Sequence, residues 1–146
     1  LEAPKASTYQ WLLHAFEKFE IDADEATITS RRKGASLKGQ LFGSSPLYLD
    51  QTDDWLVAPN KGYPTYDGEM PEKRWHFTAE TEETARCRIA AVFSVTGPDE
   101  EAPDFTLVHL NQMLTVTADG VTVNISLDEN ASNVLTVSSN TASMEI

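Results

Sequence analysis

The chain has 146 residues, and its hydrophobic fraction of 40% and charged fraction of 23% are typical of one ordinary globular domain with a sizeable core. No apolar run approaches the roughly 20 residues that cross a bilayer, which excludes a membrane span. The formal net charge of −12 argues against nucleic acid as a partner, because such binders need a basic surface.

The first candidate element is the stretch STYQWLLHAF at residues 7–16. Helical spacing gathers large side chains on one broad face, namely Trp11, Leu12, Ala15, Phe16 and Phe19. Strand spacing instead gives two faces, one with Tyr9, Trp11 and Leu13 and the other with Gln10, Leu12 and His14. Periodicity alone favours the helix, so other information has to decide.

Two hairpins are predicted further along the chain. Residues 26–42 alternate on both sides of Lys33-Gly34, where we expect the turn. Residues 111–127 contain Asp119-Gly120, a two-residue loop that favours a type I′ turn. With that turn, the apolar side chains of both arms fall on one side, in the pairs Ala118–Val121, Val116–Val123 and Leu114–Ile125.

Three more stretches alternate as strands do. Residues 73–80 alternate Trp75, Phe77 and Ala79 with polar side chains, and residues 134–139 form another short strand. Residues 85–95 are predicted as one strand with an unbroken apolar face of Cys87, Ile89, Ala91, Phe93 and Val95. Short alternating strands separated by Gly, Pro, Asn and Asp predict an all-β fold, an antiparallel β-sandwich over residues 1–146 as a single domain.

The best candidates for ligand binding come from one long irregular segment, predicted at residues 50–72, and the strand after it. Trp55, Tyr63 and Tyr66 can stack on sugar rings, although mere loop packing is equally open for them. Lys73 and Arg74 can pair with a carboxylate or sulfate. Trp75 is better explained as a core residue, because it alternates with Phe77 and Ala79.

Other basic residues also form local clusters that can hold an anion against the global charge. Arg86 and Arg88 share the non-apolar face of their strand and can line an open sheet face, and Arg31-Arg32-Lys33 lies at a hairpin tip, which is usually only solvated. Acid clusters at 50–54 and 99–104 can chelate calcium, but neither has the spacing of a known calcium loop. Cys87 is the only cysteine, and His76 and His109 have no ligand partner at useful spacing.

A family resemblance is carried by three blocks, LEAPKASTYQWLLHAFEKFEID, RRKGASLKGQLFGSSPLYLDQTDDW and KRWHFTAETEETARCRIAAVFSV. Together they resemble the C-terminal β-sandwich part of heparinase II/III-like polysaccharide lyases, over Leu1 to about Val95. The remainder fits closing strands of the same sheets. The resemblance implies that QWLLH is a strand rather than a helix. It also implies that the chain is a piece of a larger periplasmic or secreted bacterial protein.

The resemblance further implies what the piece does. These lyases cleave uronic-acid polysaccharides by abstracting the C5 proton and eliminating the 4-linked sugar, with most catalytic side chains on an upstream α/α toroid. We therefore expect this chain alone to be no enzyme and to need no cofactor. Some relatives hold a structural zinc, and His14 resembles its last ligand, the others being expected upstream of Leu1. A lone histidine cannot form a closed zinc site.

Two functions follow as expectations. The first is a non-catalytic carbohydrate-binding module for an acidic polysaccharide of the alginate, ulvan or glycosaminoglycan type. The alternative is a purely structural domain that braces the upstream catalytic domains and binds no ligand. It predicts an apolar patch with exposed large residues among Tyr9, Trp11 and Leu13. A third hypothesis, that the piece is itself a lyase, predicts unsaturated products from a uronate polymer.

Overall fold

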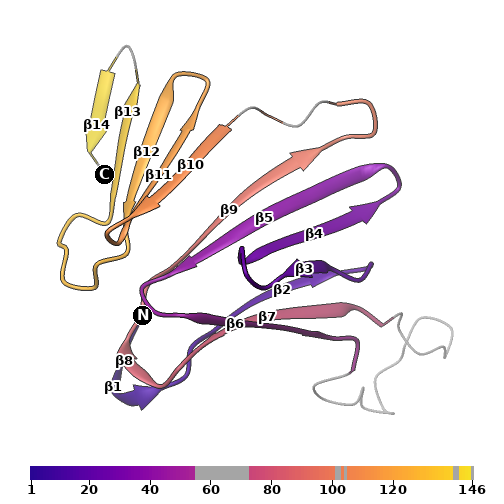
Figure 1. Ribbon diagram of the computed structural model, residues 1–146, viewed down its shortest axis with the longest axis horizontal. Helices are drawn as coiled ribbons and strands as arrows, with labels where there is room; N and C mark the ends of the chain where they lie inside the picture. The colour runs from indigo at the N-terminus through magenta and orange to yellow at the C-terminus, as the bar shows by residue number, and fades with distance from the viewer. Residues whose placement is uncertain (55–72, 101–102, 104, 140–141, 146) are drawn as a thin grey trace, which may run out of the picture.

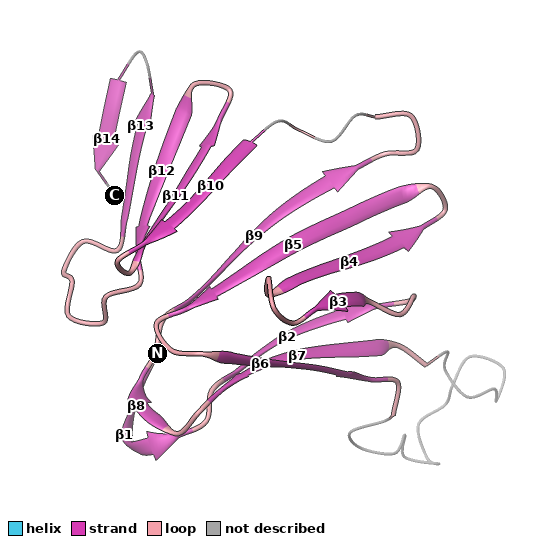
Figure 2. Cartoon of the chain, viewed as in Figure 1, coloured by secondary structure: helices cyan, strands magenta, loops and turns pink. Residues whose placement is uncertain are grey.

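The structure, a computed structural model, describes residues 1–54, 73–100, 103 and 105–139, and the backbone of 142–145. Over these ranges the chain is all-β and contains no helix, so none that is long and apolar enough to cross a membrane (Figure 2). The antiparallel sandwich predicted from the alternating patterns is confirmed. The prediction of a single domain over residues 1–146 stays a prediction.

The strands form three main sheets (Figure 1). The outer sheet has the order β2-β7-β6, with β2 (Gln10–Ala15), β7 (Trp75–Thr81) and β6 (Leu47–Thr52). The middle sheet has the order β3-β4-β5-β9, with β3 (Glu20–Asp22), β4 (Thr27–Arg32), β5 (Ala35–Gly43) and β9 (Ile89–Thr96). The C-terminal sheet runs in sequence order through β10 (Phe105–Leu110), β11 (Met113–Ala118), β12 (Val121–Ser126), β13 (Leu135–Ser139) and β14 (Ala142–Glu145). A short ribbon pairs β1 (Glu2–Ser7) with β8 (Thr84–Arg86).

Both predicted hairpins are confirmed. Strands β4 and β5 turn at Lys33 and Gly34, and β11 and β12 turn at Asp119 and Gly120. All four turn residues have positive φ, between 50° and 85°, which glycine and aspartate tolerate better than branched residues do. The pairing of β11 with β12 has the predicted register, including Val116 opposite Val123. The turn residues and the alternation of apolar side chains therefore favour the same pairing of strands.

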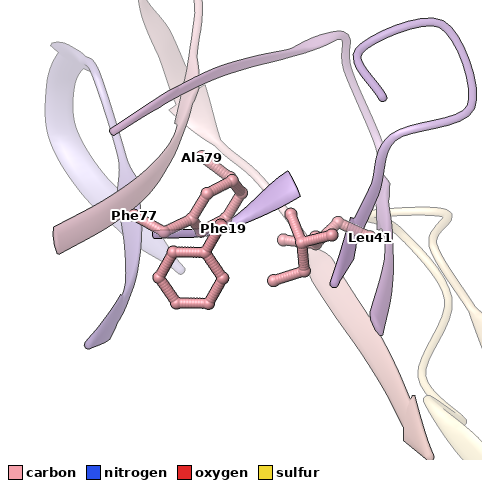
Figure 3. Packing of buried hydrophobic residues seen from close by; sticks show 5 residues of the cluster. Phe19, Leu41, Phe77 and Ala79 are labelled. Carbon is pink, nitrogen blue, oxygen red and sulfur yellow. The ribbon is translucent and has the colours of Figure 1, made fainter. Parts of the chain in front are cut away.

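The first core lies between the outer and middle sheets (Figure 3). Its buried side chains are Phe19, Ile28, Leu41, Phe77 and Ala79. Fully burying a side chain such as Phe77 contributes about 1.5–3 kcal/mol, so this cluster holds the two sheets face to face. Trp75 packs against the cluster, which confirms its assignment to the core rather than to a binding surface.

The second core lies between the middle and C-terminal sheets. It is built from Phe42, Leu114 and Leu127, with Ala90 and Val92 packed against it. Neighbouring residues of β5 thus serve different cores, Leu41 the first and Phe42 the second, because successive strand side chains point to opposite faces. The middle sheet contributes apolar side chains to both cores, one on each face. It lies between the other two sheets (Figure 1).

Three local predictions are corrected or refined. The stretch at 7–16 contains strand β2, as the resemblance implied and against its helical spacing. Residues 85–95 do not form one strand, because Cys87 and Arg88 separate β8, which pairs with β1, from β9, which pairs with β5. The predicted irregular segment starts later than residue 50, because β6 continues to Thr52.

Candidate functional site

Two arginines enclose one phenylalanine at an end of the sandwich. Phe16 follows β2 directly, and Arg74 directly precedes β7, whose register places Ala15 opposite Trp75. Arg32 is the last residue of β4 in the middle sheet. The guanidinium carbons of Arg32 and Arg74 lie 3.2 and 3.1 Å from the centroid of the Phe16 ring. We call these three residues the Arg–Phe–Arg cluster.

The two guanidinium groups occupy opposite faces of the ring, because both cannot lie about 3 Å above the same face. Each such contact contributes about 0.5–1 kcal/mol at an exposed site, and more where water is excluded. Among the described residues, the side chain of neither Arg32 nor Arg74 forms an ion pair or donates a hydrogen bond. Two like charges are therefore held close together, and no carboxylate of the described ranges pairs with either of them.

An apolar pocket adjoins the cluster. It has a volume of about 240 Å³, and Phe16 and Arg32 form part of its wall. The remainder of the wall is mostly apolar and includes Leu13, Phe19, Leu37 and Val95, and Glu17 also lines it. Val95 belongs to the apolar face that the sequence predicts for residues 85–95, but its side chain is 65% exposed. Its strand, β9, lies at the edge of the middle sheet, where fewer neighbouring side chains cover it. The pocket is thus open to solvent.

A third cation lies nearby in the chain. The ammonium nitrogen of Lys18, in the connection after β2, lies 5.1 Å from the centroid of the Trp75 ring. Lys18 has no carboxylate partner within the described part of the chain. The β2–β3 connection and the residue before β7 therefore carry positive charges on aromatic rings, with no carboxylate partner among the residues that the structure describes, in a chain whose net charge is −12.

The other predicted basic residues are engaged by protein groups. Lys73 lies 3.7 Å from carboxylate oxygens of both Asp53 and Asp54. Arg86 pairs with Glu2 at 3.0 Å. Trp55, Tyr63 and Tyr66 lie outside the described residues.

Arg88 has a structural set of contacts. Its guanidinium donates to the backbone carbonyls of Ser126, Glu129 and Ala131, the shortest at 2.7 Å. Its backbone N–H donates to the hydroxyl of Ser44. These contacts join the start of β9 to the loop after β12. The guanidinium, which the sequence predicts to bind a ligand, is therefore already hydrogen-bonded to backbone carbonyls of the protein.

The described residues do not form a closed metal site. They contain no group of three or more His, Cys, Asp or Glu side chains that could hold an ion. A closed zinc site needs about four ligands, so the zinc implied at His14 does not fit the described residues alone, and ligands upstream of Leu1 stay a prediction. In the acidic clusters at 50–54 and 99–104, which lack the spacing of a calcium loop, Asp53 and Asp54 contact Lys73, and Glu100 accepts from the Gly97 N–H.

Sequence reasoning did not foresee Phe16 and Arg32 as a site. The basic runs at 31–33 and 73–74 are separate in the sequence, and Arg32 ends β4 of the middle sheet whereas Arg74 directly precedes β7 of the outer sheet. Alternation shows which residues share a face of one sheet, and it cannot show which strand ends meet across two sheets. The sequence does contain one indication of this site: both basic runs lie at the ends of predicted strands, where polar turns begin.

Comparison with known proteins does not assign the chain: no protein-family model matches it, and no curated protein matches it in sequence.

Proposed function

We propose that this chain is a non-catalytic carbohydrate-binding module whose ligand is an acidic polysaccharide of the alginate, ulvan or glycosaminoglycan type. It would accompany the upstream catalytic domains of a periplasmic or secreted bacterial lyase that cleaves uronic-acid polymers. One observation carries the proposal: Arg32 and Arg74 enclose Phe16, with no carboxylate partner among the described residues, beside an apolar pocket.

The chemistry of the cluster suits a sugar acid. A guanidinium that contacts a ring with its face keeps its N–H groups at the edge, where they can donate two parallel hydrogen bonds to a carboxylate or sulfate. The apolar wall of the pocket can take the C–H face of a sugar ring, as in binding sites that combine apolar walls with a few polar groups. Because Phe16 separates the two cations, each keeps its own donor edge.

The distribution of charge supports the same proposal. The chain has 23 acidic and 11 basic residues, so an arginine placed at random on its surface would meet carboxylates readily. Arg31, next to Arg32, forms an ion pair with Glu20. Two adjacent arginines of one hairpin thus differ in their partners, and this difference provides a matched control.

The test is affinity electrophoresis of the purified chain in gels that contain alginate, ulvan or heparin. We expect at least one polymer to retard the wild type and the double variant Arg32→Ala/Arg74→Ala to bind about tenfold more weakly or worse. Hydrogen bonds to charged groups contribute about 1.5–3 kcal/mol each, and 1.4 kcal/mol corresponds to tenfold. Arg31→Ala removes the same charge from the same hairpin, and we expect it to bind as the wild type does.

Three outcomes would contradict the proposal. One is no retardation of the wild type by any uronate polymer, and another is unchanged retardation of the double variant. The third is an equal loss in Arg31→Ala, which would mean that any positive charge on this surface suffices. Release of unsaturated products from the same polymers would contradict the non-catalytic part of the proposal.

A second candidate, the purely structural module, is favoured by a different surface. Tyr9, Trp11 and Leu13 are only half-buried rather than exposed, so the surface expected for that role is not there. The C-terminal sheet instead exposes Val108 and Leu110 on β10 and Met113, which pairs with Leu110 on β11, at 56%, 65% and 40%. This strip is where upstream domains of the parent would dock in that alternative.

A further inference from the structure

The Phe16 ring sets the distance between the two guanidinium groups of the Arg–Phe–Arg cluster. The guanidinium carbons of Arg32 and Arg74 lie on opposite faces of the ring, 3.2 and 3.1 Å from its centroid. A cation does not approach a ring face much more closely than this, so both carbons lie over the middle of the ring rather than beside it. Their separation is therefore at most the sum of these two distances, and the ring between them keeps it from shrinking.

One acid group cannot bind both arginines of this cluster. The line between the two guanidinium carbons passes through the Phe16 ring, so ring atoms fill the space midway between them. An acid oxygen has to come within about 2.7–2.9 Å of a charged N–H donor to form a strong hydrogen bond. The C–H rim of Phe16 holds an acid group too far out for its oxygens to reach donors above and below the ring at once. The cluster therefore offers two separate anion sites.

We propose that the cluster preferentially binds polysaccharides that carry an acid group on consecutive sugars, each arginine binding one acid. This inference rests on the proposed function and specifies the ligand of that same site. Neighbouring sugars of a chain place their acid groups about one sugar ring apart, whereas acids on every second sugar are about two rings apart. Only the closer spacing is comparable with two guanidinium groups that are separated by a single aromatic ring.

The apolar pocket assigns the two arginines to different sugars of the ligand. Arg32 and Phe16 line this pocket, and Arg74 does not. The sugar whose C–H face lies in the pocket therefore pairs its acid with Arg32, and the acid of the next sugar pairs with Arg74 across the ring. Glu17 also lines the pocket, so the acid group itself stays outside, at the guanidinium edge. Arg32 is exposed and Arg74 half-buried, which leaves both accessible to a polymer.

The test compares polymers that differ in the spacing of their acids, by affinity electrophoresis of the full chain. Chondroitin carries a carboxylate on every second sugar, and chondroitin sulfate has a sulfate on the sugar between. Hyaluronan and alginate make the same comparison with carboxylates alone. In at least one pair we expect the wild type to bind the polymer with consecutive acids about tenfold more tightly or better, because only that polymer supplies an acid to each arginine.

Single variants show whether the preference comes from the cluster. In Arg74→Ala and in Arg32→Ala the ratio of affinities within that pair should fall to about one, because one arginine can use only one acid. The two variants give the same readout independently, and a melting temperature for each shows that it is folded. Arg31→Ala is the matched control and should keep the wild-type ratio, because Arg31 forms an ion pair with Glu20.

The inference and the proposed function fail in different ways. If the wild type binds both polymers of each pair equally, and Arg32→Ala/Arg74→Ala binds neither, the proposed function stands and the inference is overturned. An unchanged ratio in the folded single variants also overturns the inference, because the preference would then reflect the charge density of the polymer alone. If none of the four polymers retards the wild type, the inference is overturned together with the glycosaminoglycan and alginate ligands of the proposed function.

Discussion

At the scale of single residues, Cys87 shows how burial controls reactivity. The side chain is 1% exposed, and the backbone N–H donates to the carbonyl of Leu1 at 3.1 Å. Burial raises the pKa of the thiol, and Glu129 reinforces this effect. The thiolate is the reactive species, so this cysteine is protected both by its position and by its protonation state.

We therefore expect Cys87 to resist a thiol reagent at neutral pH in the folded chain and to react at once in denaturant. The sign of the pH effect follows from the raised pKa. The unfolded thiol ionises first, near its ordinary pKa of about 8.5, while the folded thiol keeps its proton. The free energy of unfolding should thus fall as pH rises above this value, up to the pKa of the folded state. Denaturant titrations of the wild type and Cys87→Ala between neutral and alkaline pH measure this, and a fall of equal slope in both would contradict it.

At the scale of elements, Gly39 explains how β5 and β9 pair closely. Gly39 lies opposite Phe93, whose ring stacks on Trp11 with 5.8 Å between centroids and an interplanar angle of 23°. A Cβ atom at Gly39 would overlap the Phe93 ring and approach Ile28 to 3.2 Å. The missing side chain at this position therefore makes room for an aromatic stack that bridges the outer and middle sheets.

The variant Gly39→Ala should lower the free energy of unfolding by about 1–3 kcal/mol, because the added methyl group forces Phe93 out of its stack. Denaturant unfolding followed by tryptophan fluorescence measures the change. Gly97→Ala is the control, because its Cβ would meet only the flexible carboxyl end of Glu100, at 3.1 Å, and a small effect is expected. Equal destabilisation by the two variants would show that steric contact with Phe93 is not the cause.

Features that depend on neighbouring residues, such as turns, could be predicted from the sequence, whereas features that depend on the choice of partner strand could not. Asp119-Gly120 and Lys33-Gly34 located two hairpins and the register of one, because turn residues with positive φ act locally. The break at Cys87 and Arg88 was missed, because it results from a change of partner strand, which an apolar run does not record. The helical spacing around Trp11 was misleading for a similar reason: pairing with β7 outweighed it.

At the scale of the whole molecule, Arg88 joins parts that are far apart in sequence. Its guanidinium satisfies three carbonyls next to β12, while Ser44, at the end of β5, accepts from its backbone and donates to Glu129 at 2.7 Å. One side chain thus links the middle sheet to the C-terminal sheet beside the second core. From the sequence, Arg86 and Arg88 looked equivalent, and only the tertiary structure separates them.

We expect Arg88→Ala to lower the free energy of unfolding by about 2 kcal/mol, because part-buried carbonyls lose their donors. Arg86→Ala removes an exposed ion pair with Glu2 and should lower it by less than about 1 kcal/mol. Urea denaturation of both variants makes the comparison. Similar losses in the two, or a larger loss for Arg86→Ala, would show that the carbonyl contacts are not what matters.

The order of strands in the middle sheet also determines when this chain can fold as it is made. Strand β5 ends at Gly43, but its partner β9 begins only at Ile89. A ribosome that adds about 5–20 residues per second needs several seconds to synthesise the stretch between them. During that interval one edge of β5 has no partner, and Leu41 and Phe42 lack the later strands that complete their cores, so the nascent chain exposes an unpaired apolar strand.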